Sequence, residues 1–462
     1  MDGKTIFALS SASGKAGVSI VRVSGPRAME SFRILTRMEE KPEPRKALFV
    51  PIYNPRDEND IIDRALVLPF VPPNSFTGES VVEYQLHGSP AVIDALLSAL
   101  SSIDGHRMAE HGEFTRRAFE NGKLDLTEAE AIADLINAET QEQRRQALLQ
   151  MDGVLSRLYE DWRTRLVRIM AYIETVIDFP DEDIPDSQIL TMTPDIEKLI
   201  GEITSHLNDN RRGERLRDGI EIAIVGAPNA GKSSLLNTLA RRDVAIVSPM
   251  AGTTRDVIEA HLDLSGFPVI LADTAGLRPE DILDDGGHGS VEGEGIRRAL
   301  ARANNADIRL LVFDGTEEIL NPHTLALLNE NSIAVFTKAD LCHPEEAQRL
   351  KDLIGSFAIA QDDIIQISST TGEGMDGLLE TLGGKVKTLF AASRETPSLT
   401  RARHRDALEH CLQCLQDSLT APLPELMAED LRIGARSLGR ITGRVDVEDL
   451  LDVIFRDFCI GK

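Results

Sequence analysis

Short apolar runs separated by polar loops dominate the first 120 residues of the chain. The apolar positions predict strands over 18–23, 64–71 and 81–86, and helically spaced apolar residues predict a helix over 91–100. Strands that alternate with helical segments are typical of a small α/β domain. We therefore expect residues 1–120 to form such a domain.

From residue 121 the pattern becomes helical. Apolar residues recur at helical spacing over 126–136, and Thr127 followed by Glu130 predicts a capping box at the start of this helix. Amphipathic runs continue to about residue 179, an Asp- and Pro-rich loop follows over 180–186, and another helix is predicted over 194–216. Helical patterns return after residue 382 and continue to the end of the chain.

Between the two helical stretches, apolar runs predict strands over 220–225, 268–272, 332–336 and 363–367. The predicted fold is multidomain, α/β plus all-α, with a mostly parallel sheet in this middle part. We place an N-terminal domain at 1–120, the halves of a helical domain at 121–215 and 383–462, and an inserted domain at 216–382. Loop movement in an inserted domain can be transmitted to the helices at both of its junctions.

Composition narrows the class and the location. At 462 residues and 42% hydrophobic content, the chain is long enough for two to four domains with buried cores. No apolar run has membrane-spanning length and the N-terminus lacks the apolar region of a signal peptide, so we expect a cytoplasmic protein with no membrane contact. Cys411 and Cys414 form C-x-x-C on a helical pattern, which favours two thiols on a helix face over a zinc site.

The net charge of −25 opposes unaided binding to nucleic acid. If RNA is a substrate, we expect a basic partner to supply much of the affinity.

The candidate chemistry begins at Gly226–Ser233, which reads G-x-x-x-x-G-K-S between a predicted strand and a predicted helix. In this P-loop pattern the backbone N–H groups surround phosphate oxygens, Lys232 reaches the β- and γ-phosphates, and Ser233 binds Mg²⁺. The nucleotide-binding residues predicted here are Asn229, Ala230, Gly231, Lys232, Ser233 and Ser234.

Three later motifs specify the nucleotide. Gly252–Asp256 is typical of a switch loop, in which a threonine can complete the metal site. Asp273-Thr274-Ala275-Gly276 ends a strand; the Asp273 carboxylate can hold Mg²⁺ through water, and Gly276 can contact the γ-phosphate. Thr337-Lys338-Ala339-Asp340 ends another strand; the Asp340 carboxylate can accept from the guanine N1–H and amino group, which selects GTP over ATP. Ser368, Ser369 and Thr370 end the next strand and are predicted to line the base. Many GTPases have Asn in place of Thr337, and Thr cannot make all the contacts of the Asn amide. We therefore expect guanine specificity to persist through Asp340, with weaker nucleotide affinity.

Leu277 follows the Asp273–Gly276 motif, where Ras-like enzymes use a Gln to orient the attacking water. Leucine cannot do this, so hydrolysis is either slow or uses another device. Asn229 is a candidate ligand of a monovalent cation beside the phosphates, and Glu292 is a candidate for orienting water. The alternatives, an Asn that caps the loop and a solvated Glu, stay open on the residues alone.

Further segments lie outside the GTPase motifs: residues 73–79 (PNSFTGE), 112–119 (GEFTRRAF), 123–126 (KLDL), 129–135 (AEAIADL), 178–182 (DFPDE) and 458–462 (FCIGK). With the inserted GTPase domain, these segments resemble the MnmE (TrmE) family of tRNA-modification GTPases over essentially the whole chain. The resemblance implies an N-terminal domain that binds folate and forms a homodimer, a helical domain, and a Ras-like domain whose dimerisation activates hydrolysis.

The resemblance also implies an MnmG-type partner that uses FAD and forms a hetero-oligomer with this chain. Together the two proteins would add a carboxymethylaminomethyl-type group to carbon 5 of the wobble uridine in certain tRNAs. The one-carbon unit would come from 5-formyl- or 5,10-methylene-tetrahydrofolate, and the tRNA would be bound mostly through the partner.

By resemblance, site roles fall on numbered residues of this chain. Folate contacts fall on Arg22, Glu83, Lys123 and Lys462; the chemistry is that of cations for carboxylate or formyl oxygens and a carboxylate for pterin N–H groups. The K⁺ site falls on Asn229, Ser248, Met250 and Thr253, and Mg²⁺ falls on Ser233 and Thr254. Pro249, Ala251 and Gly252 complete the nucleotide-binding loop, and Glu292 is the water-orienting acid.

Cys459 offers a thiol that could attack uridine, but nothing in the sequence lowers its pKa, so a structural or folate-adjacent role is favoured. Two other classes stay open. One is a ribosome-assembly GTPase, which shares the Asn229 type of P-loop, and the other is a regulatory GTP switch that supports no modification chemistry.

Overall fold

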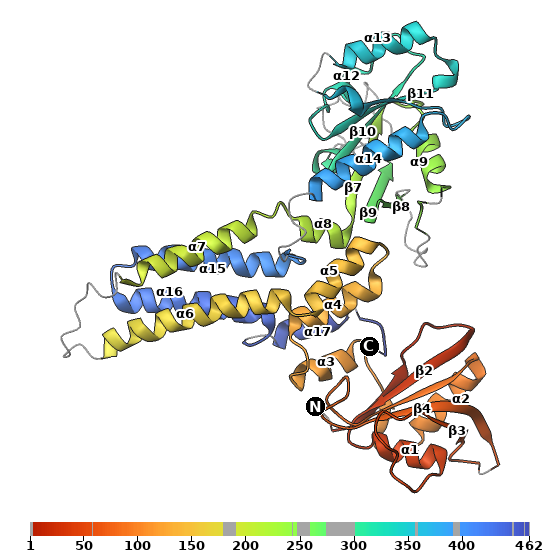
Figure 1. Cartoon of the computed structure of the whole chain (residues 1–462), viewed down its shortest axis with the longest axis vertical. Helices are drawn as coiled ribbons and strands as arrows, with labels where there is room; N and C mark the ends of the chain where they lie inside the picture. Colours follow the sequence, from red (N-terminus) through yellow and green to blue (C-terminus); the bar gives the residue numbers. More distant parts are fainter. Residues whose placement is uncertain are drawn as a thin grey trace, which may run out of the picture. The chain divides into compact units, whose positions relative to one another are not determined.

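The computed structural model describes residues 3–57, 59–178, 191–242, 244–246, 259–273, 301–355, 359–390, 398–445, 448–456 and 458–461. The chain divides into two compact units (Figure 1). The first comprises Met1–Ile136, Leu149–Gly201 and Asp406–Lys462, and the second comprises Asn137–Leu148 and Glu202–Arg405.

The N-terminal part of the first unit is a six-stranded sheet in the order β3-β4-β5-β2-β1-β6. Its neighbouring strands are antiparallel except for β1 and β6, which are parallel. The elements are β1 (Thr5–Leu9), β2 (Ala16–Ser24), α1 (Ala28–Thr36), β3 (Leu48–Tyr53), β4 (Ile61–Phe70), β5 (Val81–Gly88), α2 (Pro90–Ser101), β6 (His106–Met108) and α3 (Glu113–Glu120).

Alternation along β1 shows how this sheet is covered on both faces. Phe7 joins the core beneath α1 and α2, whereas Ile6 and Ala8 pack on the other face with Phe114 of α3. The α/β fold predicted for this part is therefore confirmed.

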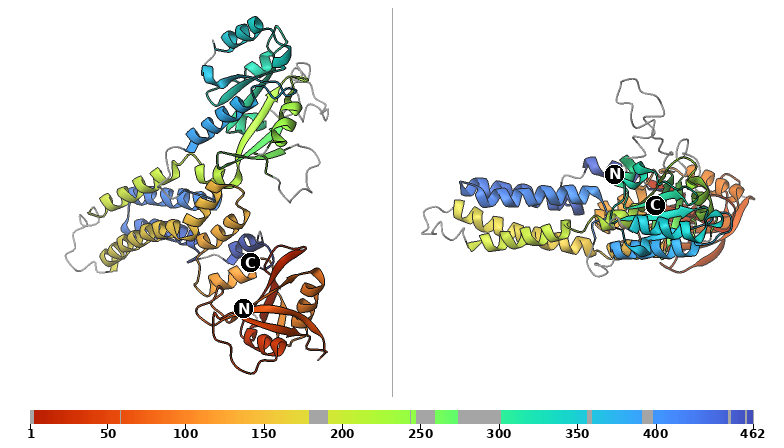
Figure 2. Two further views of the ribbon diagram at one scale, coloured as in Figure 1. Left: turned by 45° about the vertical axis from the view of Figure 1, so that its right-hand side comes forward. Right: turned by 90° about the horizontal axis from the view of Figure 1, so that it is seen from above.

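The rest of the first unit is helical. The helices α6 (Val154–Asp178), α7 (Thr193–Leu207), α15 (Ala402–Thr420) and α16 (Pro424–Thr442) lie side by side in both views (Figure 2). The helices α4 (Leu126–Asn137) and α17 (Glu448–Arg456) complete this part, whereas most of α5 (Gln141–Met151) and all of α8 (Arg212–Asp218) belong to the second unit.

Two local predictions are wrong. The single helix expected over 194–216 is two helices, because Asn210 and Arg211 adopt left-handed backbone conformations and end the run. The capping box lies two residues before the predicted pair: Asp125 accepts from the Glu128 N–H at 3.0 Å, and Glu128 accepts from the Asp125 N–H at 2.9 Å. Thr127 instead turns inward and is buried.

The second unit is built on a six-stranded sheet in the order β12-β11-β10-β7-β9-β8, parallel except for β8. Helices cover both faces (Figure 1). The elements are β7 (Ile220–Gly226), α9 (Lys232–Ala240), β8 (Glu259–Leu264), β9 (Phe267–Asp273), β10 (Ile308–Asp314), α12 (Pro322–Leu325), β11 (Ser332–Thr337), α13 (Pro344–Gly355), β12 (Ile364–Gln366) and α14 (Met375–Phe390), with 3₁₀ turns at Ala339–Leu341 and Gln361–Asp363.

The helix α14 runs without a break through residue 382, where the sequence places a domain limit. Leu382 and Val386 both belong to the core of the second unit. The domain limits drawn from the sequence stay predictions.

Candidate functional site

The P-loop lies where β7 ends, between β9 and β10, and α9 begins at Lys232. A side-chain carbon on Gly226 would lie 2.3 Å from the carbonyl oxygen of Val312, its partner on the neighbouring parallel strand β10, so only glycine fits at the end of β7. The Lys232 ammonium donates to the carbonyl oxygens of Gly226 at 3.0 Å and Ala227 at 2.8 Å. The cation therefore lies within the loop at the start of α9, where the helix N-terminus also favours phosphate.

Asn229 is exposed in this loop and has a φ of 63°, a left-handed conformation that Asn adopts more readily than most residues. The backbone therefore gives a local reason for Asn at this position, independent of any cation. Its proposed role in K⁺ binding stays a prediction.

The predicted base-binding loops lie at the ends of two neighbouring strands, β11 and β12. The Ala339 N–H donates to the carbonyl of Ile367 at 3.0 Å, which links the two loops directly. The Ser368 hydroxyl is buried and accepts from the N–H groups of Thr370 at 3.3 Å and Thr371 at 3.1 Å. Asp340 is exposed on the 3₁₀ turn after β11.

Thr337 connects the base loop to the phosphate loop. Its side chain is buried, and its Oγ1 lies 2.7 Å from the carbonyl oxygen of Ala230 and 3.1 Å from that of Phe313. The β-carbon position of Gly231 lies 3.2 Å from the Thr337 side chain, so the two loops pack closely. The sequence predicted only that Thr337 lowers nucleotide affinity relative to Asn, and it did not indicate this hydrogen bond between the base loop and the phosphate loop.

Several predicted site residues lie outside the described part of the chain: Ser248, Pro249, Met250, Ala251, Gly252, Thr253, Thr254, Thr274, Ala275, Gly276, Leu277, Glu292 and Lys462. Asp273 is the last residue of β9, at the same edge of the sheet as the P-loop. The parallel pairing of β7 with β9 places Asp273 opposite Ile224, two residues before the loop.

In the N-terminal sheet, Arg22 and Glu83 are cross-strand partners on β2 and β5. Arg22 Nε donates to Glu83 Oε1 at 2.9 Å, and the two side chains are 14% and 18% exposed. The guanidinium also lies 5.1 Å from the ring centre of Phe76 and 5.7 Å from that of Phe114. An ion pair and two rings thus hold Arg22 at the sheet surface with its charge partly accessible.

Lys123 approaches the same region from the α3–α4 connection. Its Nζ donates to the carbonyl of Pro73 at 3.0 Å, and its side chain packs beside the left-handed Gly78. Both contacts lie on the loop between β4 and β5, which also carries Phe76. The structure thus connects Lys123 and Arg22 through one loop.

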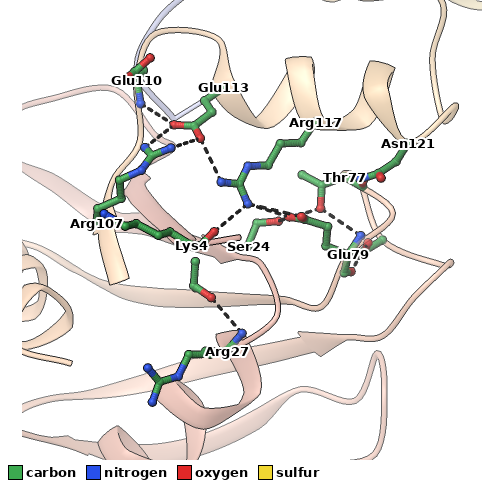
Figure 3. A network of polar contacts seen from close by, with 12 residues as sticks. Lys4, Ser24, Arg27, Thr77, Glu79, Arg107, Glu110, Glu113, Arg117 and Asn121 are labelled. Carbon is green, nitrogen blue, oxygen red and sulfur yellow. Dashed lines mark hydrogen bonds and ion pairs between the residues drawn. The ribbon is translucent and has the colours of Figure 1, made fainter. Parts of the chain in front are cut away.

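A buried polar network fixes that loop (Figure 3). Arg117 on α3, only 3% exposed, donates to Glu79 at 3.2 Å, to Glu113 at 3.0 Å and to the Lys4 carbonyl at 3.1 Å. Glu79 also accepts from the Ser24 hydroxyl at 2.8 Å. The loop is therefore tied to β2, to α3 and to the chain before β1.

Sequence reasoning singled out the segment 112–119 but gave Arg117 no role. The available signal was its spacing from Phe114, which places an arginine on the apolar face of a helix. Burial works to raise the pKa of Glu113, but hydrogen bonds from Arg107, the Glu110 N–H and Arg117 outweigh it, so the pKa lies below its ordinary value. Glu113 is therefore the charged partner that Arg117 needs at this depth.

The C-terminal tail docks on the N-terminal sheet within this unit. Phe455 and Phe458 are buried against α4, and His111 and Ile460 form an antiparallel bridge. The Ser10 hydroxyl donates to the carbonyl of Gly461 at 2.9 Å. The chain end is thus packed and hydrogen-bonded as far as Gly461.

The cysteines differ in accessibility. Cys411 and Cys414 are buried on α15 beside Gly434 of α16, and burial raises the pKa of the Cys411 thiol to about 12. Cys459 is exposed on the tail. Among the described residues, no three His, Cys, Asp or Glu side chains are grouped to hold a metal, and no helix is long and apolar enough to span a membrane.

Comparison with family models matches residues 5–123 to the "GTP-binding protein TrmE N-terminus" and residues 126–459 to the "MnmE helical domain". A tRNA modification GTPase MnmE of Parvibaculum lavamentivorans is 53% identical over 464 residues, covering 99% of this chain and 100% of the relative. The protein of the same name from Rhodospirillum rubrum is 49% identical, covering 99% of both chains.

Among solved structures, the G domain of the T. maritima FeoB iron transporter is 26% identical to this chain. It covers 36% of this chain and 98% of its own, with a TM-score of 0.27.

Proposed function

The chain belongs to the MnmE family of tRNA modification GTPases, and we propose that it uses GTP hydrolysis to drive modification of carbon 5 of the wobble uridine in certain tRNAs. The group added would be of the carboxymethylaminomethyl type. An FAD-dependent partner of the MnmG type would act with it, and a reduced folate would supply the one-carbon unit.

For GTP, one group of residues would bind the phosphates and another would bind the guanine base. Lys232, which now donates to P-loop carbonyls, would turn to the β- and γ-phosphate oxygens, and Ser233 would hold Mg²⁺ with Thr254. Asp340 is exposed at the edge of the loop pair and would accept from guanine. Thr337 would keep base and phosphate loops at a fixed separation through Ala230.

For hydrolysis, we propose that Asn229 contributes to a K⁺ site with Ser248, Met250 and Thr253. A bound monovalent cation supplies positive charge beside the phosphates, where developing negative charge needs it. Glu292 would orient the attacking water, because Leu277 cannot.

For folate, the N-terminal sheet offers a matching set of groups. The Arg22–Glu83 pair is partly exposed and complements a ligand with both carboxylates and pterin N–H donors. Lys123 and Lys462 would add positive charge for the glutamate carboxylates. The observation that carries the proposal is the docked tail: Ser10, two residues after the cross-strand partner of Arg22, donates to the Gly461 carbonyl, so the chain end lies close to the strand that bears Arg22.

We further propose a homodimer formed through the N-terminal domain and contact with tRNA mainly through the partner. The net charge of −25 supports the second point, since it disfavours unaided RNA binding.

The test removes residues 459–462 and measures two properties separately. Mass spectrometry of tRNA nucleosides from cells lacking the protein should show loss of the wobble modification, restored by the full chain and not by the truncated one. GTP binding by the truncated chain should be intact, because the second unit contains none of these residues. Full modification by the truncated chain would refute the folate site at the tail.

Normal tRNA in cells lacking the protein would favour a ribosome-assembly GTPase or a regulatory switch. Calorimetric titration with 5-formyl-tetrahydrofolate separates both classes from a folate-using enzyme, because neither predicts binding.

A further inference from the structure

Asp314, whose side chain is only 10% exposed, lies beside the base-binding loop and belongs to none of the nucleotide motifs. It is the last residue of β10, and the parallel register places it opposite Thr337, the last residue of β11. The Gly315 N–H donates to the Thr337 carbonyl at 3.0 Å, which keeps the two chains paired beyond the ends of their strands. Asp314 therefore lies next to the loop that carries Asp340.

Both oxygens of the Asp314 carboxylate accept hydrogen bonds. Oδ1 accepts from the Thr316 N–H at 3.0 Å and from the Thr316 hydroxyl at 2.7 Å, and Oδ2 accepts from the Lys338 ammonium. Burial works to raise the pKa of Asp314, but the hydrogen bonds from Lys338 and Thr316 outweigh it, so the pKa lies below its ordinary value. The carboxylate is therefore charged at neutral pH and forms an ion pair with Lys338.

Lys338 has a backbone conformation that is unfavourable for a lysine. Its φ is 58°, in the left-handed region that residues with a β-carbon seldom adopt. This conformation turns the chain from β11 into the 3₁₀ turn Ala339–Leu341, which carries Asp340. The Lys338 side chain reaches back to Asp314 on the neighbouring strand, and an ion pair that forms only in this conformation stabilises it.

The backbone around the 3₁₀ turn is also held from its other side. The Ala339 N–H donates to the Ile367 carbonyl at 3.0 Å, just after β12. The Cys342 thiol donates to the Lys338 carbonyl at 3.4 Å. The turn is thus fixed between the end of β12 and the end of β10, where Asp314 is the charged group that contacts it.

We propose that Asp314 is a positioning residue for guanine recognition: its ion pair with Lys338 holds the turn in the conformation that presents Asp340 to the base. This inference rests on the proposed role of Asp340 in binding guanine. A ligand that must order a loop loses affinity by the cost of that ordering, and an ion pair already formed in the free protein removes part of the cost. Asp314 itself does not need to touch the nucleotide.

The experiment compares calorimetric Kd values for GDP and inosine diphosphate in the wild-type and Asp314→Asn chains. Inosine lacks the amino group of guanine, so the preference for GDP reports the contact between that group and Asp340. Asparagine keeps an oxygen that can accept from Thr316 and removes the charge that pairs with Lys338. The Lys338 side chain is 39% exposed, so water screens the pair, and the Kd for GDP should rise about 2- to 10-fold. The Kd for inosine diphosphate should rise less, because this ligand has one of the two donors.

Asp363→Asn is the matched control. Asp363 is 14% exposed and pairs with Lys385 at 2.9 Å in the same unit. It precedes β12, whereas the base-binding loop follows that strand. The control therefore removes a similar ion pair away from the loop, and its preference for GDP over inosine diphosphate should equal that of the wild-type chain.

A Lys338→Gly background tests whether Asp314 acts through Lys338. Glycine adopts the left-handed conformation without the steric penalty and offers no side chain for Asp314 to hold. In this background Asp314→Asn should have no additional effect on either Kd. A general defect of the Asp314→Asn chain would persist there.

The outcomes distinguish the inference from the function on which it rests. If the wild-type chain binds GDP and inosine diphosphate equally, or if Asp340→Ala leaves the preference unchanged, the proposed role of Asp340 and this inference both fail. If Asp340→Ala lowers the preference and Asp314→Asn does not, or if Asp314→Asn has the same effect in the Lys338→Gly background, this inference alone is overturned.

Discussion

Replacing Thr337 by Val should lower both the free energy of unfolding of the second unit and its affinity for nucleotide. Valine keeps the shape of threonine and removes only the hydroxyl. That hydroxyl is buried, and its single proton has the Ala230 carbonyl at 2.7 Å as its nearer acceptor. The substitution therefore removes the hydrogen bond that Thr337 donates to the Ala230 carbonyl in the P-loop.

The expected size follows from this geometry. A buried polar group that loses its partner costs about 1–3 kcal/mol, which bounds the fall in the free energy of unfolding of the second unit. Nucleotide affinity falls only if the P-loop of the free variant relaxes to another conformation, because binding must then restore the original one. At about 1.4 kcal/mol per factor of ten, the full 1–3 kcal/mol corresponds to about 5- to 150-fold, which is the upper limit of the loss in GDP affinity.

Titration with a fluorescent GDP analogue measures the affinity, and calorimetric unfolding of nucleotide-free protein measures the stability. Thr388→Val is the control, because Thr388 is an exposed helical residue of the same unit whose hydroxyl donates to the Gly384 carbonyl at 3.0 Å. Thr337→Ser should lie close to wild type. A Thr337→Val protein with wild-type affinity and an unchanged calorimetric midpoint would refute the role of this hydroxyl.

Three further predictions concern the nucleotide. GTP hydrolysis should be faster in K⁺ than in Na⁺ at equal ionic strength, and Asn229→Ala should abolish the difference; equal rates for the wild-type chain would exclude a specific cation. Asp340→Asn should shift preference from guanine towards xanthine nucleotides, at about 1–3 kcal/mol per mispaired contact, whereas unchanged GTP affinity would show that another residue reads the base. Glu292→Ala should lower turnover with nucleotide affinity nearly intact; unchanged turnover would transfer the role to Glu294.

The sequence predicted best where function depends on neighbours along the chain. Strand, loop and helix around the P-loop follow from a few consecutive residues, so periodicity and glycine spacing were sufficient. The helical break near Asn210 and the capping box at Asp125 were missed because each requires choosing among several polar residues within one turn. Local propensity separates such alternatives by about 1 kcal/mol or less.

Contacts between distant residues were beyond pattern reasoning. Thr337 bonds a residue 107 positions earlier, and Arg117 reaches Glu79 38 positions earlier. Nothing in the spacing of these residues indicates the pairing, because the fold alone brings them together. A buried arginine was signalled only by its place on the apolar face of α3, and naming its partners needs coordinates.

Most of α5 groups with the second compact unit of the structure. Residues Asn137–Leu148, most of α5, belong to the second unit. The Glu142 N–H donates to the Gly266 carbonyl at 3.1 Å, and the side chains of Gln143 and Gln146 donate to carbonyls of α8. These three hydrogen bonds hold α5 against the β8–β9 turn and α8.

The sequence predicts an insertion with two junctions, near residues 216 and 382. The two compact units of the structure exchange chain at 136/137, 148/149, 201/202 and 405/406, and the predicted domain limits stay predictions. The β8–β9 turn, which lies in sequence between the two predicted switch segments, is bonded to α5, and α5 continues through the chain into α4, whose capping box begins two residues after Lys123.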